Sequence, residues 1–83
     1  RLLVDGDNIL IPAPWTDGEW FAYNESGEAY TWPIPEEWGG AKELKTVRLT
    51  YRGSTVTSVM KVINGKIIIE PTNGEALAIS LKK

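Results

Sequence analysis

Carboxylates are the side chains of this sequence that come nearest to a catalytic arrangement. A glycosidase needs two such groups about 5 to 10 Å apart across a cleft. The closest pairs here are Glu36 with Glu37 and Glu25 with Glu28. Gly, Pro or Ser stands beside each pair, which is typical of solvated turns, and a chain of 83 residues has little room for a cleft. These acids are therefore predicted to be surface residues.

Nucleophilic chemistry has no recognisable set of partners. The sequence contains no histidine and no cysteine, which removes the usual general base, the thiolate nucleophile and the commonest metal ligand. The serines fall in predicted turns or strands with no visible base: Ser26, Ser54, Ser58 and Ser80. We therefore expect a chain that has no catalytic residues of its own, is not an enzyme and needs no cofactor.

One short segment resembles the opening of a calcium loop. Asp5-Gly6-Asp7-Asn8 clusters oxygen ligands of the kind that hard cations bind. The further acids and the distal bidentate Glu of a complete loop do not follow at the required spacing. A plain turn is the favoured interpretation, so no metal site is predicted beyond weak calcium binding at Asp5 and Asp7.

The aromatic residues are more informative, because all four tryptophans lie in the first half of the chain. In an extended segment, Trp20 points to the opposite face from Phe21 and Tyr23, so these rings cannot all enter one core. Exposed Trp and Tyr rings can stack on sugars. For any single Trp, a place in the core or at an interface is favoured over a ligand site. The candidates for carbohydrate or interdomain contact are Trp15, Trp20, Tyr23, Tyr30, Trp32 and Trp38.

Charge and hydropathy exclude several kinds of partner. Nine basic and eleven acidic residues are scattered along the chain, with a net charge of −2. No basic stripe is present that would neutralise phosphates, so nucleic acid is excluded as a partner. No apolar run approaches the roughly 18 residues that span a bilayer, so a membrane is excluded too. Without cysteines, stability must come from packing.

The second half of the chain alternates with the period of β-strands. In the segment 45–52, Val47, Leu49 and Tyr51 share one face and are predicted to be its buried side. Asn64-Gly65 is the preferred pair for a two-residue hairpin turn. That turn predicts that Ile63 faces Lys66, and that the pairing continues along both flanking strands. A final strand is expected over 76–81.

The first half has shorter strand signals. Runs at 2–4 and 8–11 are separated by an Asp-Gly turn, and the segment 19–23 is expected to form a hairpin with 28–34. One helical turn is expected over 35–38, because proline suits the first helical position. The edges predicted to pair with another chain are 2–4 and 76–81.

These elements predict one all-β domain over residues 1–83, with no internal boundary. The expected fold is a small antiparallel β-sandwich of about eight short strands with Greek-key or jelly-roll-like connections, and a small barrel is the alternative. The chain begins with Arg1 instead of Met. We therefore expect it to be a processed product or, as the preferred interpretation, a segment of a larger protein.

The order of aromatic and turn landmarks resembles one family. Its pattern is an IPW start, an aromatic-Tyr-Asn segment, a TW-x-(I/L)-P-x-x-W segment and a V-x-NG-K hairpin. The matching segments here are 10–15, 20–24, 31–38 and 62–66. This order is similar to a C-terminal β-sandwich accessory domain of bacterial glycoside hydrolases of the endo-α-N-acetylgalactosaminidase type. Ala13 is inserted in the IPW start, and the turn at 52–54 is shorter than in that pattern.

The resemblance implies that this chain acts through its place beside another domain. It implies a non-catalytic domain that packs against an adjacent catalytic barrel in an extracellular or cell-surface bacterial enzyme. Two alternatives stay open: a carbohydrate-binding module that presents exposed Trp and Tyr rings to a glycan, and a β-sandwich spacer of a cell-surface adhesive protein. Such spacers can carry Lys-Asn isopeptide bonds, for which the candidates are Lys45, Lys61 and Asn64.

Overall fold

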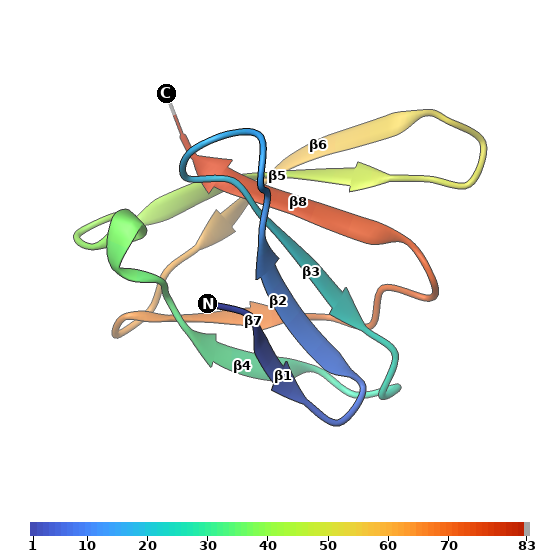
Figure 1. Ribbon diagram of the computed structural model, residues 1–83, viewed down its shortest axis with the longest axis horizontal. Coiled ribbons are helices and arrows are strands. Elements are labelled where there is room, and N and C mark those ends of the chain that lie inside the picture. The colour runs from blue at the N-terminus through green and yellow to red at the C-terminus, as the bar shows by residue number, and fades with distance from the viewer. Residues whose placement is uncertain (83) are drawn as a thin grey trace.

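The computed structural model describes residues 1–82 and consists almost entirely of β-strands joined by short turns (Figure 1). The elements in chain order are β1 (Leu3–Asp5), β2 (Asn8–Pro12), β3 (Trp20–Asn24), β4 (Tyr30–Pro33), the 3₁₀ turn η1 (Glu36–Trp38), β5 (Glu43–Leu49), β6 (Thr55–Lys61), β7 (Lys66–Ile69) and β8 (Ala76–Leu81). The prediction of an all-β domain with about eight short strands is confirmed. Within the described residues, no helix is long and apolar enough to cross a membrane.

The strands form two antiparallel sheets. The larger has six strands in the order β1-β2-β3-β8-β5-β6, and the smaller pairs β4 with β7. In Figure 1 the small sheet lies below β5, β6 and β8 of the large sheet, at the level of β1, and the β5–β6 hairpin extends beyond it. The predicted small antiparallel β-sandwich is therefore the observed architecture.

The C-terminal strand occupies the middle of the large sheet. β8 pairs with β3 on one side and with β5 on the other, so the prediction that residues 76–81 form a free edge is wrong. Leu3 and Val4 of the predicted edge 2–4 do lie at an edge, because within residues 1–82 β1 pairs with β2 alone. The central place of β8 joins the aromatic first half of the chain to the regular second half.

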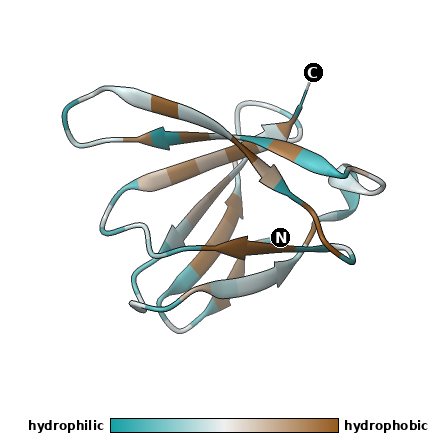
Figure 2. Cartoon of the chain, turned by 180° about the vertical axis from the view of Figure 1, so that it is seen from behind, coloured by the Kyte–Doolittle hydropathy of each residue, from teal (hydrophilic) through white to brown (hydrophobic). Residues whose placement is uncertain are grey.

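The core lies between the two sheets. The large sheet contributes one face of alternating residues, and the small sheet and η1 close over it. The buried cluster consists of Leu10, Trp20, Ala22, Trp32, Trp38, Leu44, Ile67, Ile69, Leu77 and Ile79. Figure 2 shows that hydrophobic segments occur in both sheets, while the connecting turns are mostly hydrophilic.

The buried face of β5 is the opposite of the predicted one. Leu44 is fully buried and Thr46 is 5% exposed, whereas Leu49 is 40% and Tyr51 is 80% exposed. Leu44 and Thr46 therefore face the core, and they alternate along the chain with the residues that were predicted to do so. Apolar residues occur on both faces of this strand, so alternation marks the strand but does not identify the side that the small sheet covers.

Two predicted hairpins are also different in the structure. The Asn64-Gly65 turn forms with positive φ at both residues, and Ile63 faces Lys66 as predicted. The ladder stops there, because β6 pairs with β5 while β7 pairs with β4. Segment 19–23 likewise pairs with β2 and β8 instead of with β4. The predicted helical turn at 35–38 is confirmed in position as η1.

Candidate interaction surface

The six-stranded sheet has a second apolar face, which points away from the small sheet. We call it the outer face. Strand register places Ile11 opposite Phe21, Phe21 opposite Ala78, and Ala78 opposite Val47. One row of apolar side chains therefore crosses four neighbouring strands. The apolar residues of the outer face are Val4, Ile9, Ile11, Phe21, Tyr23, Val47, Leu49, Val59, Ala76 and Ala78.

Several of these side chains are open to solvent. Val4 is 57%, Leu49 is 40% and Val59 is 49% exposed, while Phe21 and Val47 are half-buried by their neighbours on the same face. Charges gather at one end of the face, where Glu43 lies opposite Lys61 and forms an ion pair with Lys82 at 2.9 Å. The Lys82 hydrogen bond lowers the pKa of the Glu43 carboxyl. The centre of the face is apolar, and its end is polar.

Trp15 extends this surface from the loop between β2 and β3. The loop is closed by a hydrogen bond of 2.8 Å from the Ala13 amide to the Glu19 carbonyl. The Trp15 ring lies 5.6 Å from Phe21 at a tilt of 49° and is 71% exposed. It is therefore the tryptophan of the predicted contact set that solvent, a partner or a ligand can reach.

Trp20 and Trp38 are core residues. They are 2% and 0% exposed and pack edge to face at 6.1 Å. Each indole is satisfied inside the domain, since Trp20 Nε1 donates to Glu37 Oε2 at 2.8 Å and Trp38 Nε1 donates to the Gly18 carbonyl at 2.7 Å. Burial removes both rings from any exposed platform. For these two tryptophans the structure shows a place in the core, which was favoured over a ligand site for any single Trp.

Trp32 and Tyr30 lie together on the inward side of β4. Trp32 is 7% exposed and packs against the half-buried Tyr30 at 4.7 Å. The Tyr30 hydroxyl donates to Asp5 Oδ2 at 2.5 Å, and this bond raises the pKa of the tyrosine. Tyr23 lies apart from them, half-buried on the outer face opposite Ile9. The structure therefore divides the predicted contact residues between the core and the outer face.

Glu37 is held by two donors at the end of the core. Arg1 forms an ion pair with its carboxylate and stacks over the Trp20 ring at 5.1 Å. Burial alone would raise the pKa of Glu37, but the hydrogen bonds from Trp20 and Arg1 outweigh it, so the pKa is lowered from its ordinary value. Glu37 is thus a structural anion that satisfies a buried indole.

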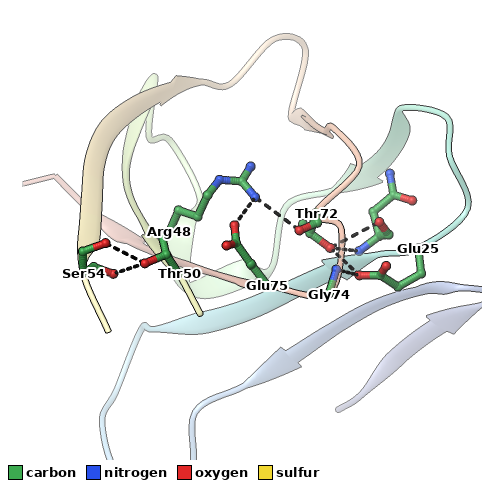
Figure 3. Close-up of polar contacts among 8 residues, drawn as sticks. Glu25, Arg48, Thr50, Ser54, Thr72, Gly74 and Glu75 are labelled. Atoms are coloured by element: carbon green, nitrogen blue, oxygen red, sulfur yellow. Dashed lines mark hydrogen bonds and ion pairs between the residues drawn. The ribbon is translucent and has the colours of Figure 1, made fainter. Parts of the chain in front are cut away.

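A buried polar cluster joins the β3–β4 loop to the β7–β8 loop, as part of Figure 3 shows. Asn24 and Thr72 are both 0% exposed. The Asn24 amide donates to Thr72 Oγ1 at 2.8 Å, and Asn24 Nδ2 donates to the Ile69 carbonyl at 2.9 Å. Glu25 Oε2 accepts from Thr72 Oγ1 at 2.9 Å and from the Gly74 amide at 2.6 Å. Sequence reasoning missed this cluster, because its members lie 48 residues apart.

Two of the four glutamates considered at first for chemistry have structural partners. Glu25 holds the loop cluster, and Glu37 holds Trp20. Asp5 accepts from Tyr30, and within residues 1–82 no group of three or more acids is arranged to hold a metal ion. The three isopeptide candidates, Lys45, Lys61 and Asn64, are all exposed.

Comparison with known proteins assigns the chain to no family, so its fold is the basis on which its class is defined. No protein-family model matches the chain, and no curated protein matches it. The class of molecule that the fold defines is a small all-β domain of a six-stranded and a two-stranded sheet. Its surface includes the apolar outer face with Trp15 beside it.

Proposed function

We propose that this chain is a non-catalytic accessory β-sandwich domain of a bacterial carbohydrate-active enzyme, a glycoside hydrolase of the endo-α-N-acetylgalactosaminidase type. It packs through its outer face against the adjacent catalytic domain. The single observation that carries the proposal is the apolar row from Ile11 through Phe21 to Val47 on the uncovered face. The landmark order described above supplies the enzyme class and an extracellular or cell-surface location.

The physical support is the cost of leaving such a face in water. Each Å² of apolar surface removed from water contributes about 25 cal/mol. Monomeric proteins rarely expose large contiguous apolar patches, and those that do commonly use them for binding. Within residues 1–82 the small sheet and η1 cover one face of the large sheet, so the other face is open to a partner from outside the chain.

The rigidity of the outer face suits a partner that stays docked on it. A paired sheet is rigid, so docking on it orders few additional side chains. Aromatic residues near the centre of an apolar patch are the usual anchors of an interface, and Phe21 with Trp15 supplies that pair. The charged end at Glu43, Lys61 and Lys82 supplies a polar rim.

A charge placed on the face tests the proposal in the full-length gene product. Val47→Glu introduces a carboxylate in the middle of the row, next to Lys45 on the same face. The matched control is Thr31→Glu, because Thr31 is exposed on β4. Val47→Glu is expected to separate the thermal unfolding of this domain from that of its neighbour, while the control leaves one joint transition. Identical melting of both variants would contradict docking through this face.

A glycan-binding role is the second candidate, and the exposure of Trp15 favours it. Beside the Trp15 loop lies an open depression of about 350 Å³ with polar groups from Asp17, Glu19, Lys45 and Ser80. An exposed aromatic ring next to hydrogen-bonding groups is the usual arrangement of a sugar site. Affinity electrophoresis of the chain in gels containing polysaccharide or mucin glycans tests this role, with Trp15→Ala as the variant. Unretarded migration of the unmodified chain would remove this candidate and leave docking untouched.

A further inference from the structure

The two edges of the six-stranded sheet are built differently. β1 is an edge of three residues that ends on Asp5, whose carboxylate is bonded to Tyr30. β6 is an edge of seven residues, Thr55–Lys61, without proline and with one charge, at its end. Its residues are exposed except for Met60. Proteins normally blunt a long edge with charges, prolines or a covering loop, and within the described residues 1–82 β6 has none of these along most of its length.

The hydrogen bonds at both ends of β6 show which backbone groups are free. The Thr50 amide donates to the Ser54 carbonyl at 3.1 Å, and the Val62 amide donates to the Lys42 carbonyl at 2.9 Å. Bonded and non-bonded pairs alternate along an antiparallel ladder. Ser54, Ser58 and Val62 therefore direct their amide and carbonyl groups toward β5. The residues that direct these groups away from the sheet are Thr55, Thr57, Val59 and Lys61.

These outward residues are symmetric about Ser58. If a second β6 runs antiparallel beside the first with Ser58 opposite Ser58, then Thr57 faces Val59 and Thr55 faces Lys61. Every outward amide then meets an outward carbonyl of the other copy. We propose that a second copy of this chain pairs with β6 in this register and forms a two-fold dimer with one continuous sheet.

Side chains and charges agree with this register. Val56 faces Met60 on the inward side, and Thr57 faces Val59 on the outer side, so the larger apolar groups meet apolar or β-branched ones. The two Lys61 residues lie about 20 Å apart along the strands, because six residues separate each from the position opposite its counterpart. That distance exceeds the Debye length at physiological salt. A parallel pairing of the two β6 strands, or an antiparallel pairing in another register, does not give this combination of facing side chains and separated charges.

Charge exchange at Ser58 tests both the dimer and its register, because this position meets only itself across the two-fold axis. Ser58→Lys and Ser58→Glu each place like charges face to face, while an equimolar mixture places opposite charges there. By sedimentation, the unmodified chain is expected to rise from 9.2 kDa toward twice that mass with concentration. Each variant alone stays near 9.2 kDa, and the mixture associates again.

Controls separate this edge from the rest of the surface. Ser58 is exposed, so circular dichroism should show that both variants fold. Thr31→Glu on the exposed side of β4 should leave association unchanged. The proposal fails if the unmodified chain stays monomeric up to about 1 mM, the weak end of specific affinities, or if Ser58→Lys associates as well as the unmodified chain. Association that resists Ser58→Lys but is lost in Val47→Glu would assign the contact to the outer face, and would also contradict the proposal.

Discussion

The two faces of the six-stranded sheet have similar chemistry and different surroundings. The inner face carries Leu44, Leu77 and Ile79, and the small sheet covers it. The outer face carries Phe21 on β3 and Val47 on β5, and no second sheet within residues 1–82 covers it. The comparison shows that hydrophobicity along a strand does not by itself define the core. What defines the core is the presence of a second layer.

The largest effect is expected where the same substitution is made on the two faces of β5. Leu44→Glu places a carboxylate in a fully buried site without a partner, which costs several kcal/mol and should unfold a domain of this size. Val47→Glu lies half-buried on the outer face and should cost about 1 kcal/mol or less. Urea unfolding followed by circular dichroism measures both. Equal losses would mean that the two faces are equally packed within the chain.

A smaller effect is expected in the buried loop cluster. Thr72→Val keeps the shape of the side chain but removes the acceptor of the Asn24 amide, and an unsatisfied buried donor costs about 1 to 3 kcal/mol. The matched control is Thr57→Val on the exposed strand β6, which should change stability by less than about 0.5 kcal/mol. If Thr72→Val behaves like its control, water replaces the hydroxyl and the cluster does not stabilise the two loops.

The smallest effect is expected from Glu37, and it depends on pH. The folded pKa of Glu37 lies below its ordinary value of 4.5. Its charge therefore stabilises the fold above pH 4.5, and this contribution is lost as the pH falls through the folded pKa. Glu37→Gln should lower stability by less than about 1 kcal/mol at pH 7, and the difference from the unmodified chain should shrink in acid. Glu36→Gln serves as the exposed control. A difference that stays constant with pH would show that charge is not involved.

The sequence predicted the local features of the fold because local features have local causes. Alternation identified most strands, and Asn64-Gly65 identified a turn, since positive φ at both positions suits these residues. The pairing of β4 with β7, and the place of β8 between β3 and β5, depend on segments far apart in the chain. No short-range pattern encodes such a choice, so the predicted hairpin partners of β4 and β7 and the predicted free edge at 76–81 were wrong.

The candidate site was predictable in residue type but not in position. The six aromatic residues were singled out together, yet Trp20, Trp32 and Trp38 lie in the core while Trp15 is exposed. One indole differs from another only through its neighbours, such as the Glu37 carboxylate that satisfies Trp20. The apolar outer face was missed because Val47 and Leu49 were assigned to the core. Both errors come from the same cause, which is that a strand pattern does not identify its covering layer.

The most direct test of docking through the outer face is the accessibility of a single cysteine. The chain has no cysteine of its own, so Leu49→Cys reports the outer face and Thr31→Cys reports the exposed side of β4. Thiol labelling is compared between the 83-residue chain and the full-length gene product, with the unmodified full-length protein as background. We expect Leu49→Cys to react readily in the chain alone and at least about tenfold more slowly in the full-length protein, since a buried site reacts only after it opens. Thr31→Cys should react equally in both. Equal labelling of Leu49→Cys in the two proteins would contradict the proposal that a neighbouring domain covers the outer face.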